Sequence, residues 1–117
     1  MNDELRRLYE REFLPVNRRF KEMITAWQLQ GSDPERFEDL MPVIRDVLRR
    51  CAAEHMELAS YPDRFEKAAM KVTAGEYRWL SGVFVDSCHT VWFELHARLM
   101  RLLGISRGQE ETDGTVP

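Results

Sequence analysis

The chain has 117 residues, of which 44% are hydrophobic, and a formal net charge of −3. This length accommodates a single compact domain, and the aromatic content excludes the composition typical of disordered chains. The slightly acidic balance lacks the basic excess of most nucleic-acid-binding proteins. No stretch has the pattern of a signal peptide or of a membrane span. We therefore expect a cytoplasmic protein with one helical-bundle domain over residues 1–104.

The N-terminal part of the chain has apolar residues at intervals of three and four, which is the spacing of one helix face. It predicts a helix over residues 3–32, kinked at Pro15 because proline removes a backbone donor. The stretch Ser32-Asp33-Pro34-Glu35 follows Gly31 and has the pattern of a helix start, with a serine cap and a glutamate three residues later. It opens a second predicted helix over residues 33–59, in which Pro42 indicates a further kink or break.

Two further starts follow in the C-terminal half. Ser60-Tyr61-Pro62-Asp63 predicts a third helix over residues 61–72. Thr73-Ala74-Gly75-Glu76 has the spacing of a capping box and predicts a fourth helix over residues 74–103, ended by Gly104. Residues 105–117 form a flexible polar tail in this interpretation. The predicted fold is all-α, a compact antiparallel bundle of about four helices.

The fourth predicted helix carries more apolar surface than one helix face can bury. From Trp79 to Leu95 it is apolar almost all round, which is typical of a helix with neighbours on several sides. Gly82 lies inside it, at a cost of about 1 kcal/mol relative to alanine, and indicates either a close helix neighbour or a kink. We therefore expect a homodimer, and a non-catalytic module for protein–protein interaction or assembly that needs no cofactor. The residues expected at the interface are Trp79, Phe84, Trp92, Phe93 and His96.

The three histidines allow a second interpretation, in which the bundle holds a transition metal such as iron or zinc. Helical bundles build such sites from inward-facing histidines and carboxylates on facing helices. Asp86-x-x-His89 is the nearest approach in this chain to the Glu-x-x-His motif of di-iron bundles, and it occurs once. Satisfied core histidines are the commoner explanation. The candidate ligands are Glu54, His55, Asp86, His89 and His96.

Two pairs of arginines allow a third interpretation, a small helical subunit of a nucleoprotein complex. Arg18 and Arg19 lie in the first predicted helix, and Arg49 and Arg50 in the second. Together they would form a phosphate-binding patch if they faced the same side. Interleaved acidic residues favour a solvated, salt-bridged face instead. Neither cysteine lies in a pattern that predicts a catalytic thiol, so an enzyme is the less favoured class.

Overall fold

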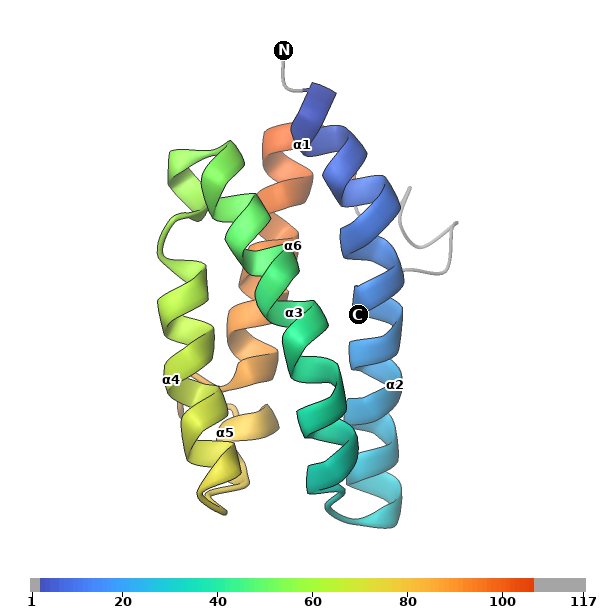
Figure 1. Ribbon diagram of the computed structural model, residues 1–117, viewed down its shortest axis with the longest axis vertical. Coiled ribbons are helices and arrows are strands. Elements are labelled where there is room, and N and C mark those ends of the chain that lie inside the picture. The colour runs from blue at the N-terminus through green and yellow to red at the C-terminus, as the bar shows by residue number, and fades with distance from the viewer. Residues whose placement is uncertain (1–2, 107–117) are drawn as a thin grey trace.

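The structure is a computed structural model in which residues 3–106 are described. They form an all-α bundle with extents of 42 × 29 × 25 Å, as the sequence predicts (Figure 1). The predicted tail lies almost entirely outside the described residues, apart from Ile105 and Ser106.

The first long helical segment is continuous but changes its winding before Pro15. It consists of α1 (Asp3–Leu8), the π-helical turn η1 (Tyr9–Phe13) and α2 (Leu14–Gln30). A proline ring clashes with the carbonyl four residues earlier in an α-helix, and a wider π turn accommodates it. The predicted interruption at Pro15 therefore takes the form of a π turn just before that residue. Gly31, with φ of +98°, ends α2. The side chain of Asp33, and not the predicted Ser32, caps the next helix by accepting from the N–H of Arg36.

The second long helix, α3 (Pro34–Glu54), runs without a break through Pro42. It ends earlier than predicted because His55 adopts an extended conformation, with φ of −153° and ψ of 131°. The Nδ1 atom of His55 accepts a hydrogen bond from the backbone N–H of Glu57, which starts the 3-10 turn η2 (Met56–Leu58). The next helix, α4 (Tyr61–Thr73), agrees with the predicted third helix to within one residue.

The predicted fourth helix over residues 74–103 is wrong in its first half. The Thr73–Glu76 segment ends α4 instead of opening a helix: Gly75 has φ of +94°, and the N–H of Glu76 donates to the carbonyl of Lys71. A short helix α5 (Arg78–Ser81) and a loop over residues 82–87 follow. Only then does α6 (Cys88–Leu103) begin, capped by the hydroxyl of Ser87, which accepts from the N–H of Thr90 at 3.2 Å.

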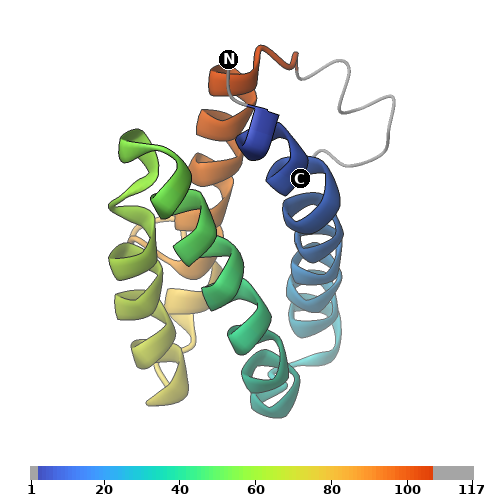
Figure 2. The ribbon, with the colours of Figure 1, turned by 45° about the horizontal axis from the view of Figure 1, so that its top comes forward.

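The helices enclose one core rich in aromatic rings. Neighbours along the chain pack in order, α2 on α3, α3 on α4 and α4 on α6, and Figure 2 shows α6 closing the bundle beside the N-terminal helices. Aromatic side chains fill the space between η1–α2 and α6: the rings of Phe13 and Trp92 stack with centroids 4.7 Å apart. Arg6 joins the same elements at one end of the bundle by donating to the carbonyl of Leu103 at 2.7 Å.

Candidate functional site

The most unusual surface feature is the loop over residues 82–87 between α5 and α6. Val83 is 81% exposed and Phe84 is 98% exposed, so two consecutive apolar side chains project into solvent. An exposed single apolar residue is ordinary on protein surfaces, but a protruding pair at the tip of a structured loop is a mark of binding sites. We refer to the loop over residues 82–87 as the Phe84 loop.

The backbone of the Phe84 loop is held at both of its ends. The N–H of Gly82 donates to the carbonyl of Arg78 at 2.7 Å, and a Cβ atom at Gly82 would lie 2.5 Å from that same oxygen. Glycine is therefore required here by a close approach of the chain to itself. At the other end the N–H of Ser87 donates to the carbonyl of Val85 at 2.8 Å, and Ser87 is fully buried. The exposed side chains of Val83 and Phe84 therefore lie between two backbone segments that are fixed by hydrogen bonds.

Arg64 of α4 fixes the Phe84 loop from the side. Its guanidinium donates to both carboxylate oxygens of Asp86, at 3.0 and 2.8 Å, and also to Glu94 of α6. Paired hydrogen bonds between a guanidinium and a carboxylate are directional and fix orientation as well as distance. Hydrogen bonding to Arg64 lowers the pKa of Asp86 and of Glu94, and the two carboxylates raise the pKa of Arg64. The loop, α4 and α6 are therefore joined by one charged cluster.

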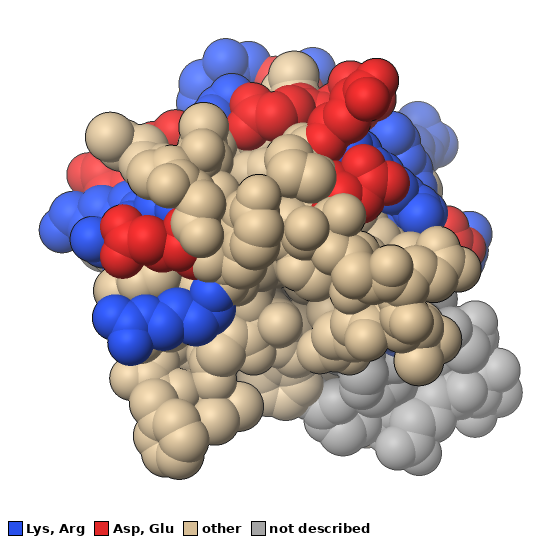
Figure 3. Space-filling model, turned by 90° about the horizontal axis from the view of Figure 1, so that it is seen from below, with Lys and Arg blue, Asp and Glu red and all other residues tan. Residues whose placement is uncertain are grey.

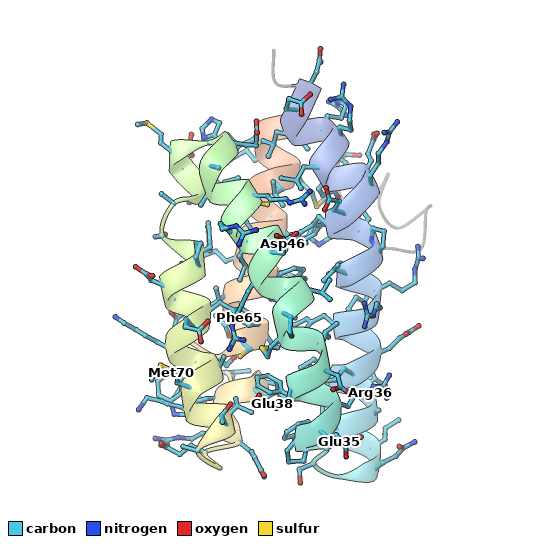
Figure 4. All side chains as sticks on the ribbon, viewed as in Figure 1. Glu35, Arg36, Glu38, Asp46, Phe65 and Met70 are labelled. Atoms are coloured by element: carbon cyan, nitrogen blue, oxygen red, sulfur yellow. The ribbon has the colours of Figure 1, made fainter. Side chains whose placement is uncertain are left out.

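A surface depression of about 400 Å³ lies beside the Phe84 loop. Most of its surface comes from apolar atoms, although four of the six lining residues carry a charge. Lys71 Nζ lies 5.1 Å from the centre of the Trp79 ring, and buried Nε1 of Trp79 has no hydrogen-bond partner among the described residues. Met70 is 65% exposed, and Figure 4 shows it on the outer side of α4 while Phe65 lies on the inner side. The depression is lined by Arg64, Lys67, Met70, Lys71, Trp79 and Asp86.

Uncharged residues dominate the end of the bundle that lies at the bottom of Figure 1. In Figure 3, which views this end, charged residues gather along the upper and lateral rim, and the centre and lower part are tan. The connection between α4 and α5 contributes Tyr77, whose ring packs edge-on against Trp27 of α2 with centroids 5.1 Å apart.

The structure distributes the five predicted interface residues over different environments. Phe84 is exposed, Trp79 lines the depression, and Phe93 is 41% exposed on α6. Trp92 and His96 are each 1% exposed, so the expectation that they contact a partner is wrong. Both are covered by the N-terminal helices of the same chain: Trp92 donates to Asn17 at 2.9 Å, and Tyr9 Oη lies 3.0 Å from His96 Nε2.

The Phe84 loop and the depression beside it also include residues that the sequence pattern did not predict. Val83 lay inside a predicted helix, where its full exposure could not be anticipated, and Met70 and Arg64 belong to a different helix. Gly82 was the one feature of the sequence that indicated an interruption of the predicted helix. A glycine in an otherwise apolar helical pattern marks a point where the pattern ends as well as a point of close packing.

The candidate metal ligands are not brought together. His55 caps η2, Asp86 pairs with Arg64, and His96 lies in the core beside Tyr9. His89 is half-buried against Phe20, with ring centroids 6.4 Å apart, and burial lowers its pKa. Within residues 3–106 there is no group of three or more histidine, cysteine, aspartate or glutamate side chains arranged to hold a metal ion.

The four arginines of the proposed nucleic-acid patch are all exposed, two on α2 and two on α3. The α3 pair is engaged by acidic neighbours: Arg49 pairs with Asp46, and Arg50 pairs with Asp46 and Glu12. The α3 half of the patch is therefore partly neutralised, as a salt-bridged face would be.

Both cysteines are buried in the core. Burial raises the pKa of Cys51 to about 12 and raises that of Cys88 as well. A thiol that stays protonated at neutral pH is a poor nucleophile, so these residues act as small core side chains.

Comparisons of the chain with protein-family models, curated proteins and solved structures give no match. Among the described helices, none combines the length and the apolar character needed to cross a membrane. The fold and the site therefore define this protein as a helical bundle that carries a structured loop with an exposed apolar tip.

Proposed function

We propose that this chain is a non-catalytic helical assembly module that forms a homodimer through the face carrying the Phe84 loop. The observation that carries the proposal is the nearly complete exposure of Phe84 on a loop whose base is held by Arg64, Gly82 and Ser87. A fixed loop loses little conformational freedom on binding, so most of the gain from burying its tip is kept as affinity. Burying one phenylalanine contributes about 1.5–3 kcal/mol.

The proposed contact surface lies on the Phe84 loop and not on α6 itself. The apolar residues of α6 are largely covered inside the chain, since Val91, Leu95 and Leu99 are fully buried. The exposed apolar residues Val83 and Phe84 lie on the loop before α6, and Phe93 is the one large hydrophobic residue of α6 itself that is exposed. A two-fold interface uses the same face of each copy, so each exposed residue contributes twice.

The mass of the protein in solution tests this proposal directly. Light scattering at micromolar concentration should give about twice the chain mass of 13.8 kDa. Phe84→Ser should shift the protein toward the monomer without loss of helicity, because its side chain makes almost no contact within the chain.

A matched control is available at another site. Met56 is 84% exposed in η2, the green turn near the top of the bundle in Figure 1, and Met56→Ser should leave the mass unchanged. A monomeric wild type, or a Phe84→Ser variant that stays fully dimeric, would refute the proposed function.

A further inference from the structure

We infer that the depression beside Trp79 is a second binding surface, and that it takes an acidic segment of a partner protein. The inference is independent of the proposed homodimer, because it rests on two lysines of α4 and not on Phe84. The depression lies along α4 from Arg64 to Lys71, and its remaining walls come from Trp79 and Asp86.

The lining of the depression carries positive charge that the chain does not neutralise. Arg64 and Asp86 pair with each other, and Arg64 also pairs with Glu94. Lys67 and Lys71 are the remaining charged residues of the lining, and neither forms an ion pair with another described residue. Lys67 acts on Asp86 only through a weaker attraction that helps to lower the pKa of that carboxyl group. Two ammonium groups are therefore available to an acid from another molecule.

The two lysines are spaced to meet acidic side chains. Lys67 and Lys71 lie one turn apart on the same side of α4, about 6 Å along the helix axis. Nζ of Lys71 lies 5.1 Å from the centre of the Trp79 ring. This contact positions the ammonium group without neutralising it, because the ring carries no net charge and leaves N–H donors for an acceptor. Lys71 is therefore a positioned donor for a carboxylate.

The rest of the depression favours an apolar side chain next to those carboxylates. Most of its surface comes from apolar atoms, and Met70 in its lining is 65% exposed. Its volume of about 400 Å³ lies within the range of roughly 300–1,000 Å³ found for ligand sites. Buried donors are nearly always paired, so the buried Nε1 of Trp79, which has no partner among the described residues, is consistent with an acceptor from another molecule.

This combination suits an acidic protein segment better than a nucleic acid. Interfaces with DNA are more polar and much more positively charged than contacts between proteins. Here two unpaired lysines border a depression whose surface is mostly apolar. A segment in which acidic and apolar side chains alternate matches both properties.

Fluorescence anisotropy with a short labelled peptide of alternating glutamate and leucine tests this site. The peptide should bind the wild type at low salt, and a peptide with glutamine in place of glutamate should bind about 10-fold more weakly. Lys67→Gln together with Lys71→Gln should cause the same loss. Arg18→Gln together with Arg19→Gln removes the same charge from exposed positions of α2 and should leave the affinity unchanged. Far-UV circular dichroism checks that each variant is folded.

Charge reversal gives a result that a loss of stability cannot imitate. Lys67→Glu together with Lys71→Glu should abolish binding of the acidic peptide. The same variant should bind the corresponding peptide of alternating lysine and leucine, which the wild type should not bind. Met70→Ser should weaken binding of the acidic peptide to the wild type about 3-fold, because part of the apolar contact is lost, and Met56→Ser should not.

Other results would overturn the inference. No binding of the acidic peptide at low salt, or binding that survives the loss of both lysines, excludes an acidic partner at the depression. An oligonucleotide that binds more tightly than the peptide, and is lost with the same lysines, assigns the depression to nucleic acid. Tighter peptide binding by a chain that ends at Ser106 assigns it to the chain's own acidic residues Glu110, Glu111 and Asp113.

Discussion

Arg64 and Asp86 are joined by two hydrogen bonds of 3.0 and 2.8 Å that tie the first turn of α4 to the loop before α6. The same guanidinium reaches Glu94, one and a half turns into α6. A single side chain thus fixes where the Phe84 loop ends and how α6 lies against α4. This pairing and the turn at Gly82 hold the two ends of the loop that carries the exposed Phe84.

Replacing Arg64 with glutamine should loosen the loop and weaken self-association. The variant loses charge-assisted hydrogen bonds to two carboxylates, and we expect a fall in the free energy of unfolding of about 1–2 kcal/mol because the groups are partly solvated. Urea unfolding and ultracentrifugation measure the two effects. Arg45→Gln is the matched control, since Arg45 makes two similar bonds to Glu66 away from the loop. Equal weakening of self-association by both variants would contradict a specific role for the contacts of Arg64 with Asp86 and Glu94.

Acidification should remove the stabilising effect of Arg64. In the folded chain the pKa values of Asp86 and Glu94 lie below their ordinary values of 3.8 and 4.5. Their contribution to stability is therefore complete above these ordinary values and is lost as the pH falls through the lowered ones. The difference in unfolding free energy between wild type and Arg64→Gln should be constant from about pH 7 to 5 and shrink below about pH 4. A difference that stays constant down to pH 3 would count against this linkage.

Asn17→Ala should destabilise the core although it deletes only a small polar side chain. Asn17 is 1% exposed and accepts the indole hydrogen bond of Trp92 at 2.9 Å. Loss of this acceptor leaves a buried donor poorly satisfied, at a cost of about 1–3 kcal/mol in unfolding free energy. Thr25→Ala, at an exposed position of the same helix, is the control. Equal denaturation midpoints for the two variants would show that the hydrogen bond contributes nothing net.

Gly82→Ala should disturb the turn at which α5 ends. The added Cβ would lie 2.5 Å from the carbonyl oxygen of Arg78, so the backbone must shift, and overpacking of this kind costs about 1–3 kcal/mol. We expect a lower melting temperature and weaker self-association. Ser81→Ala at the preceding position should change neither. A Gly82→Ala variant that is more stable than the wild type would show that this segment prefers to be helical.

The two cysteines should be unreactive in the folded chain. Since burial raises the pKa of Cys51 to about 12 and raises that of Cys88, the thiolate fraction at pH 8 is very small. A disulfide reagent such as dithionitrobenzoate should label native protein slowly and both thiols rapidly after unfolding in guanidinium. Rapid labelling of one thiol in native protein would show that a core cysteine is accessible.

The candidate site shows where local patterns stop being informative. The apolar spacing of residues 77–103 correctly indicates helical structure in α5 and α6, and it correctly places Leu95 and Leu99 on an inner face. It also predicts one helix through Gly82, because periodicity alone does not show whether an apolar residue such as Phe84 contacts the core or solvent. Of the residues predicted at an interface, Trp92 and His96 are instead core residues.

The sequence by itself determined the helical class of this protein, because apolar residues at intervals of three and four and local caps act over one or two turns of chain. Asp33 and Gly104 lie at the ends of helices for this reason. Only the tertiary structure decided which apolar residues are covered: Phe13 and Tyr9 cover Trp92 and His96 from a segment more than 70 residues away. It also decided how the loop before α6 is fixed, because Arg64 of α4 holds Asp86, and this contact depends on packing between helices.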